Sequence, residues 1–88
     1  MDLGLRDRVC IVTGSTAGIG RETARLLAEE GARAVTCGRS EAGPGVGEEL
    51  HVAADLSLPE APRELVAAAE RTFGRVDCLV NNVGFAIQ

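Results

Sequence analysis

A glycine-rich turn between an apolar segment and a helical pattern constrains this chain more than any other feature. Residues 13–20 read Thr-Gly-Ser-Thr-Ala-Gly-Ile-Gly. They follow residues 9–13, whose short, β-branched apolar run indicates a buried strand. They lead into residues 19–30, where one face of a helix is predicted from side chains at helical spacing: Ile19, Thr23, Leu26, Leu27 and Glu30. A strand-to-helix turn of this kind presents free backbone N–H groups at the helix N-terminus, where a phosphate can bind.

The spacing of the glycines excludes two commoner nucleotide sites. Gly14, Gly18 and Gly20 form G-x-x-x-G-x-G, whereas the common dinucleotide pattern is G-x-G-x-x-G, and no Lys follows them as a P-loop requires. Gly14 allows a tight turn, Gly18 allows phosphates to approach the backbone, and Gly20 allows the helix to pack closely on a sheet. A role in packing alone is the alternative, and three glycines at one junction make it the less favoured one.

The remaining segments alternate between strand and helix patterns. We expect strands at 9–13, 34–37, 52–54 and 76–80, and helices at 19–30 and 60–73. The apolar face of the second helix is predicted from Leu65, Ala69 and Phe73, which follow one another at intervals of four residues. Residues 38–50 are rich in glycine and include a proline, so they predict a loop. This alternation implies a parallel sheet with right-handed crossovers. The predicted fold class is therefore α/β, a Rossmann-type parallel sheet with flanking helices and strand order 3-2-1-4, which is one incomplete half of such a domain.

Composition narrows the range of functions. The chain has 88 residues, enough for one domain at most, and its formal net charge of -4 with no basic run argues against nucleic-acid binding. No apolar stretch approaches the length of a membrane span, and the N-terminus has no apolar core of a secretory signal. Cys10, Cys37 and Cys78 have no metal-ligand spacing, so we expect buried free thiols, a cytoplasmic location and no metal site. The lone His51 is expected to be structural.

Three motifs together carry a resemblance to a known family. T-G-x-x-x-G-I-G after the segment Val-Cys-Ile-Val resembles the N-terminal part of the short-chain dehydrogenase/reductase family. Asp55-Leu56 follows the third expected strand, where that family has an Asp near the adenine ring. Residues 81–84 read Asn-Asn-Val-Gly at the end of the fourth strand, where the family has N-N-A-G. The resemblance extends from Leu5 to the end of the chain and implies that residues 1–88 are the N-terminal part of an NAD(P)-binding Rossmann domain.

The resemblance implies a role for each matching residue. The pyrophosphate would be lined by Gly14, Ser15, Thr16, Gly18, Ile19 and Gly20. The adenine would be held by the Asp55 side chain and the Leu56 backbone. The residues at the centre of the sheet, next to the cofactor ribose, would be Asn81, Asn82 and Gly84. For the two asparagines, a purely structural role as a cap of the strand is an equal alternative.

The residues after the second strand bear on the choice of cofactor. Enzymes that use NAD have a carboxylate there, which accepts a hydrogen bond from the ribose 2′-hydroxyl. In this chain the position is Gly38, followed by Arg39 and Ser40, and a guanidinium binds a 2′-phosphate well. We therefore expect NADP in preference to NAD. Arg39 as a solvated loop residue is the alternative, and Glu41 could still serve a ribose hydroxyl.

The family's chemistry is hydride transfer between a nicotinamide cofactor and a carbonyl or alcohol substrate. Its members use a Tyr as general acid/base, a Lys four positions later that lowers the pKa of the Tyr, and a Ser that polarises the substrate oxygen. This chain has no Tyr and no Lys, so no catalytic residue is assigned and the chain alone is expected to be inactive. The resemblance implies a fragment of a longer, homo-oligomeric oxidoreductase. A non-catalytic NADP-binding module or a truncated inactive product is the alternative.

Overall fold

Strands and helices alternate along the part of the chain that the computed structural model describes, residues 4–14 and 18–81. The elements in chain order are β1 (Val9–Val12), α1 (Gly18–Glu29), β2 (Arg33–Gly38), β3 (Leu50–Ala53), α2 (Ala61–Phe73) and β4 (Cys78–Val80). Each element that the sequence pattern predicts is present, with ends that differ by at most two residues. Residues 39–49 form no helix, as expected from their glycines.

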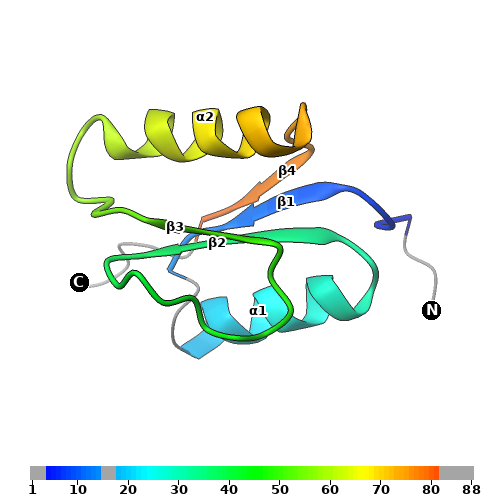
Figure 1. The fold of residues 1–88 in the computed structure, drawn as a ribbon. Helices are drawn as coiled ribbons and strands as arrows, with labels where there is room; N and C mark the ends of the chain where they lie inside the picture. Colours follow the sequence, from blue (N-terminus) through cyan, green and yellow to red (C-terminus); the bar gives the residue numbers. More distant parts are fainter. Residues whose placement is uncertain (1–3, 15–17, 82–88) are drawn as a thin grey trace.

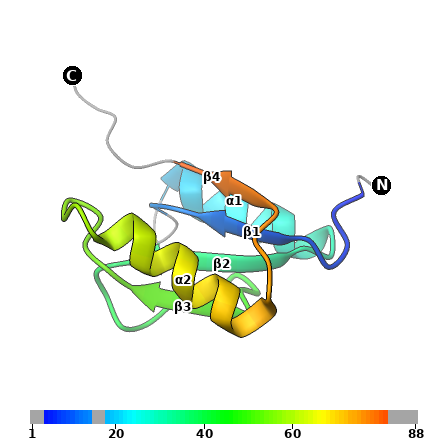
Figure 2. The same ribbon diagram turned by 90° about the horizontal axis from the view of Figure 1, so that it is seen from above.

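The four strands form one parallel sheet in the order β3-β2-β1-β4 (Figure 2), which confirms the predicted strand order. Ile11 of β1 lies between Val35 of β2 and Leu79 of β4. Val35 in turn pairs with Leu50 of β3. Because all pairs are parallel, the carboxyl ends of the four strands meet at one edge of the sheet.

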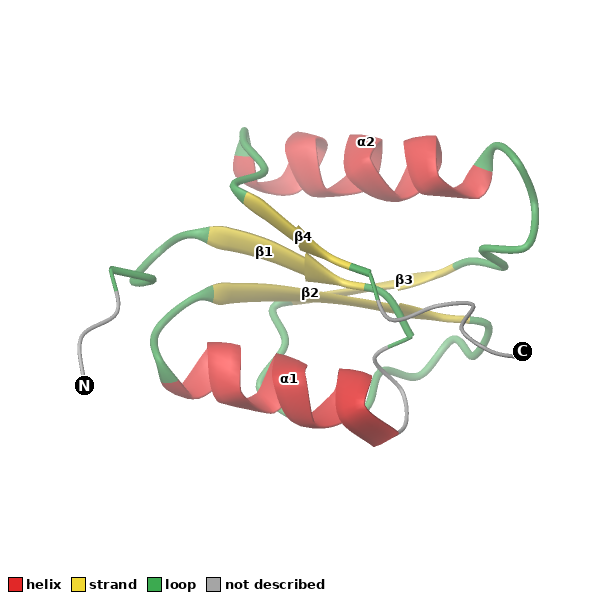
Figure 3. Ribbon diagram, turned by 180° about the vertical axis from the view of Figure 1, so that it is seen from behind, coloured by secondary structure: helices red, strands yellow, loops and turns green. Residues whose placement is uncertain are grey.

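The two helices cover opposite faces of the sheet (Figures 1 and 3). On the α2 face lies a core cluster of buried side chains: Val9, Ile11, Val35, Cys37, Leu65 and Ala69. Since side chains alternate along a strand, Thr36 and His51, which pair in register, face the α1 side. The loop of residues 39–49 also packs on this side, because a Cβ added at Gly47 would lie 3.2 Å from the Cβ of Ala28 in α1.

The expected buried stripe of α1 is wrong at two positions, whereas Thr23 and Leu27 of that stripe are half-buried. The stripe predicted from the sequence included Ile19 and Leu26, but these side chains are 79% and 50% exposed. The buried positions of the helix are Gly20 and Ala24. These small residues at i and i+4 allow the helix axis to lie close to the strands, and Ile19 and Leu26 lie on the more exposed side of the helix.

The fourth strand is shorter than expected, because Asp77 changes the pairing at its start. The backbone N–H of Val9 donates to Asp77 Oδ2 at 2.9 Å, and the Asp77 N–H donates to the carbonyl of Val9 at 2.9 Å. The Asp77 carboxylate thus accepts from the Val9 N–H, which in a longer β4 would donate to a backbone carbonyl of that strand. Regular pairing begins one residue later, at Cys78 with Cys10.

Candidate functional site

The carboxyl edge of the sheet gathers the described candidate residues from four separate segments. Gly14 follows β1, Arg39 and Ser40 follow β2, Asp55 and Leu56 follow β3, and Asn81 follows β4. In open parallel α/β sheets, ligands bind outside this edge. Four candidates, Ser15, Thr16, Asn82 and Gly84, lie outside the described residues.

The turn between β1 and α1 has the backbone geometry that an anion site requires. Gly14 has φ 63 and Gly18 has φ 60, a region that side chains with a Cβ rarely adopt. Among the described residues, nothing lies within 4 Å of a Cβ added at Gly18, so they leave open space beside this residue. The first turn of α1 has no acidic residue, so no carboxylate there opposes an anion at the positive end of the helix dipole. Ile19 is exposed beside this space, whereas Gly20 is buried.

Thr13 is a site residue that the sequence analysis did not assign. Its hydroxyl donates to Asn81 Oδ1 at 2.9 Å and its backbone N–H donates to the carbonyl of Val80 at 2.9 Å. The side chain is buried, with 5% exposure. Thr13 therefore ties the end of β1 to the end of β4 and orients the Asn81 amide. The position of Thr13 directly before Gly14 is the sequence feature that could have pointed to it. Its hydrogen-bond partner, Asn81, depends on the pairing of β1 with β4.

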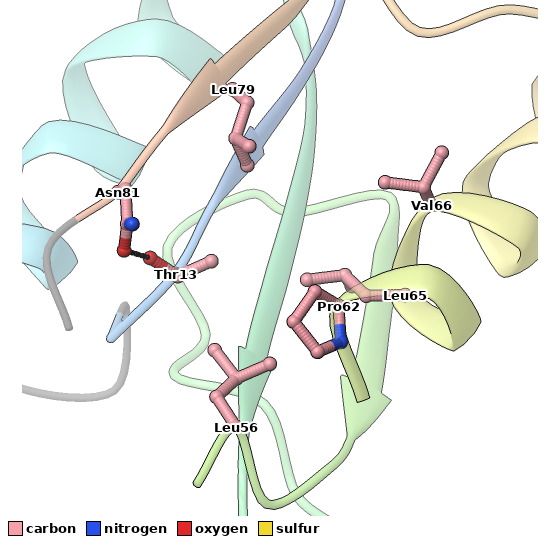
Figure 4. A pocket seen from close by; sticks show the side chains of 7 residues that line it. All are labelled: Thr13, Leu56, Pro62, Leu65, Val66, Leu79 and Asn81. Atoms are coloured by element: carbon pink, nitrogen blue, oxygen red, sulfur yellow. Dashed lines mark hydrogen bonds between the residues drawn. The ribbon is translucent and has the colours of Figure 1, made fainter. Parts of the chain in front are cut away.

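A cavity of about 280 Å³ opens between this edge and α2 (Figure 4). Two of the candidate residues, Leu56 and Asn81, line it from the segments that follow β3 and β4. The other lining residues are Thr13, Pro62, Leu65, Val66 and Leu79. Apolar walls with a few polar groups at one side are typical of small-molecule sites.

Arg39 and Asp55 form an ion pair across the ends of β2 and β3. Arg39 Nε lies 3.8 Å from Asp55 Oδ1, and the two side chains are 81% and 39% exposed. Asp55 Oδ1 also accepts hydrogen bonds from the Ser57 hydroxyl at 2.7 Å and the Ser57 N–H at 3.0 Å. The bonds from Ser57, followed by the charge of Arg39, lower the pKa of Asp55. An exposed ion pair of this kind adds little stability, so Arg39 can exchange it for a bound anion.

His51 connects β3 to the backbone of Ser40. The Thr36 hydroxyl lies 2.8 Å from His51 Nδ1, and His51 Nε2 lies 2.9 Å from the carbonyl oxygen of Ser40. The Ser40 hydroxyl in turn accepts from the Ala42 N–H at 3.2 Å. A structural role is the expectation for His51 from the sequence, and its ring contacts the segment that carries Arg39.

The cysteines differ in exposure. Cys10 and Cys37 are free and buried, as expected, but Cys78 is exposed because β4 is an edge strand of the described sheet. Burial, followed by the proximity of Cys78, raises the pKa of the Cys10 thiol to about 11. Within residues 4–14 and 18–81, no cluster of three or more His, Cys, Asp or Glu side chains could hold a metal ion. The helices of the same ranges include none long and apolar enough to cross a membrane.

Comparison with known proteins gives one consistent result. The family model for short chain dehydrogenase matches residues 8–88. L-fucose dehydrogenase of Bos taurus is 41% identical over 92 residues, which cover 97% of this chain and 34% of that protein. The chain therefore spans about a third of the length of this curated relative.

Solved structures agree with the sequence comparison. Aldohexose dehydrogenase of Thermoplasma acidophilum matches with a TM-score of 0.83 and 31% identity, over 99% of this chain and 33% of that one. L-sorbose reductase of Gluconobacter frateurii, solved with NADPH and L-sorbose, matches with a TM-score of 0.86 and 35% identity, over 99% of this chain and 37% of that one.

Proposed function

The chain belongs to the short-chain dehydrogenase family, and on this premise we propose that residues 1–88 are the cofactor-binding N-terminal portion of an NAD(P)-dependent oxidoreductase. The cofactor would supply hydride transfer to or from a carbonyl or alcohol substrate. The observation that carries the proposal is the turn between β1 and α1, with two left-handed glycines, open space at Gly18 and no carboxylate in the first helical turn.

The pyrophosphate is proposed to lie against this turn. Backbone N–H groups at the start of α1 would donate to its oxygens, and the helix dipole would stabilise its charge. Gly14 and Gly18 allow the close approach, and Ile19 would border the same space. Hydroxyl contacts from Ser15 and Thr16 are part of the proposal from the sequence pattern alone.

The adenine is proposed to lie beside Asp55 and Leu56. Ser57 donates both of its hydrogen bonds to Asp55 Oδ1, so Oδ2 is the oxygen proposed to accept from the exocyclic amino group. The low pKa of Asp55 keeps this carboxylate ionised, which strengthens such a bond. Leu56 lines the adjoining cavity and would add an apolar contact. Asn81, held by Thr13, would border the ribose, with Asn82 and Gly84 beyond it in the chain.

NADP is proposed as the preferred cofactor. β2 ends at Gly38, which offers no carboxylate to a 2′-hydroxyl, and Arg39 directly follows with an exposed guanidinium. The structurally similar L-sorbose reductase was solved with NADPH, which supports the preference. NAD is the alternative, with Glu41 as the exposed carboxylate for the ribose.

Catalysis is proposed to need groups beyond these residues. A chain without Tyr and Lys lacks the acid/base pair of its family, so we expect no turnover from the 88-residue polypeptide. Homo-oligomer formation by the whole enzyme, a cytoplasmic location, and the absence of nucleic-acid and membrane partners remain predictions from the sequence. A non-catalytic NADP-binding module is the alternative function.

Titration with cofactor tests the proposal. The chain has no Trp or Tyr, so the fluorescence of NADPH and NADH can be followed without protein background, and calorimetry gives the affinities. We expect saturable binding that is tighter for NADPH. Arg39→Ala should weaken NADPH binding about tenfold, because it removes a charge-assisted phosphate contact, and should leave NADH binding nearly unchanged.

A matched control separates this effect from a general loss of positive charge. Arg71 is exposed in the last turn of α2, at the end of the sheet away from the site, and Arg71→Ala should change neither affinity. Absence of binding by a chain that circular dichroism shows to be folded would contradict the proposed function.

A further inference from the structure

An imidazole ties the start of the loop that follows β2 to the sheet. His51 is the second residue of β3, and its register partner on β2 is Thr36. Both ring nitrogens have partners: Nδ1 lies 2.8 Å from the Thr36 hydroxyl and Nε2 lies 2.9 Å from the Ser40 carbonyl oxygen. Ser40 is outside the regular pairing of β2, which ends at Gly38.

The chemistry of the partners determines the direction of both hydrogen bonds. A carbonyl oxygen can only accept, so His51 Nε2 carries the proton and donates it to Ser40. In the neutral ring Nδ1 then accepts, and the Thr36 hydroxyl is its donor. Thr36 is fully buried at 0% exposure, so its hydroxyl has a fixed position in the sheet. The hydrogen bonds from Thr36 to His51 and from His51 to Ser40 therefore restrain the position of the loop backbone.

The segment held in this way carries Arg39, the residue proposed to bind the 2′-phosphate. The Arg39 side chain is 81% exposed, and its ion pair with Asp55 is long, at 3.8 Å. The side chain itself is thus weakly restrained, and the direction in which it leaves the sheet depends on the backbone on either side. On one side is Gly38, whose carbonyl accepts from the Ala54 N–H at 2.8 Å. On the other is Ser40, whose carbonyl is held by His51.

We propose that His51 is a positioning residue that holds the Arg39–Ser40 segment and thereby sets the preference of the site for a 2′-phosphorylated dinucleotide, an inference that rests on the proposed function. A guanidinium binds phosphate through two parallel hydrogen bonds, which demand a defined orientation. Support from a second layer of residues that locks the backbone supplies that orientation. His51 needs no contact with the cofactor to act in this way.

Two substitutions of His51 each keep one of its two hydrogen bonds and remove the other. The side-chain amide of Gln reaches about as far as Nε2 and can still donate to Ser40, whereas that of Asn ends near Nδ1 and keeps only the bond with Thr36. Adenosine 2′,5′-bisphosphate and 5′-AMP isolate the half of the cofactor that this segment would bind, and NADPH and NADH extend the comparison. The quantity measured for each variant is the ratio of affinities with and without the 2′-phosphate.

We expect His51→Asn to lower this ratio about tenfold, because the phosphate loses a correctly oriented charge-assisted contact, while affinity for 5′-AMP and NADH stays within about twofold. His51→Gln keeps the donor to Ser40 but loses the bond from Thr36, so its ratio should lie between that of His51→Asn and that of the unaltered chain. An unchanged ratio in His51→Asn, or an equal loss of affinity for both members of each pair, would overturn the inference and leave a structural role only. Lack of nucleotide binding by the unaltered chain would instead overturn the proposed function.

A second pair of variants applies if His51→Asn does not fold. Thr36→Val removes the donor to Nδ1 with almost no change in shape, and Thr36→Ser keeps it. A reduced ratio in the Val variant with a normal ratio in the Ser variant supports the positioning role. Equal ratios in the two variants count against it.

Discussion

Gly18 and Gly74 adopt the same left-handed backbone region at opposite edges of the sheet. Gly18 has φ 60 at the start of α1, and Gly74 has φ 82 at the end of α2. A Cβ added at either position would meet nothing within 4 Å. At the scale of the residue, the two sites therefore share a conformational requirement, and only Gly18 lies at the edge where a ligand is proposed to bind.

Gly18→Ala and Gly74→Ala should both destabilise the fold by about 1 kcal/mol, because L-residues are disfavoured in this region. Only Gly18→Ala should lose NADPH affinity, since only Gly18 lies in the turn that is proposed to bind the pyrophosphate. Urea unfolding gives the stabilities, and titration with NADPH gives the affinities. Equal NADPH affinity in the two variants would show that the space before α1 is not the phosphate site.

The sequence predicts single residues at the site better than their partners. Gly14, Arg39, Asp55 and Asn81 all lie at the expected edge, because the strand-ending pattern alone places them there. The ion pair of Arg39 with Asp55 could not be predicted, since it depends on the alignment of β2 with β3. The same holds for the contact of His51 with Ser40, which are 11 positions apart in the chain.

At the scale of elements, β1 and β4 are joined at both ends by side chains. Thr13 and Asn81 join them at the carboxyl edge, and Asp77 joins them at the amino edge. The Asp77 carboxylate accepts from Val9 and from Arg75, whose Nη2 lies 2.6 Å from Oδ1. The hydrogen bonds from Arg75 first, and then the Val9 N–H, lower the pKa of Asp77.

Asp77→Asn should destabilise the protein in a pH-dependent way. Because the pKa of Asp77 in the folded state lies below its ordinary value of 3.8, the ionised carboxylate contributes its full stability above that value. The contribution is lost as pH falls through the folded-state pKa, so the difference in unfolding free energy between the two chains should shrink there. Thermal unfolding from pH 7 to pH 2 measures this.

Glu70→Gln is the control for removal of one negative charge, since Glu70 is exposed on α2 and its side chain has no ion pair within the described residues. A constant difference between Asp77→Asn and the unaltered chain across the pH range would contradict the role given to the ionised carboxylate.

The elements were predictable where large apolar residues define a period and less so where small residues do the packing. Leu65 and Ala69 of α2 are buried as their spacing predicts. In α1 the leucines suggested the wrong face, because Gly20 and Ala24 allow a close approach that a hydrophobic pattern does not reveal. The early end of regular β4 pairing was hidden for a similar reason, since it depends on a side chain that binds a backbone donor.

At the scale of the whole molecule, β4 is an edge strand of the described sheet and exposes apolar surface. Leu79 is 56% exposed and also lines the cavity under α2. An exposed strand edge with an apolar side chain favours pairing with another chain. We expect the 88-residue polypeptide to self-associate as its concentration rises.

Leu79→Lys should shift this polypeptide toward monomer, because a lysine on an edge strand opposes pairing. Leu58→Lys is the matched control: Leu58 is also exposed, at 47%, but lies in the turn before α2. Sedimentation velocity over a range of concentrations distinguishes the two. A monodisperse monomer for the unaltered chain would refute the expected association.

The hydrogen bond between Thr13 and Asn81 joins residues 68 positions apart, almost the whole described chain. Local fraying of either strand end breaks it, so the carboxyl edge near β1 and β4 keeps its shape only while the sheet is intact. The cooperativity of unfolding and the affinity for a ligand are thereby linked. A molecule that binds across this edge binds only the intact sheet, so by mass action it raises the free energy of global unfolding. The increase in the free energy of unfolding on addition of a ligand therefore measures how far the ligand occupies the site.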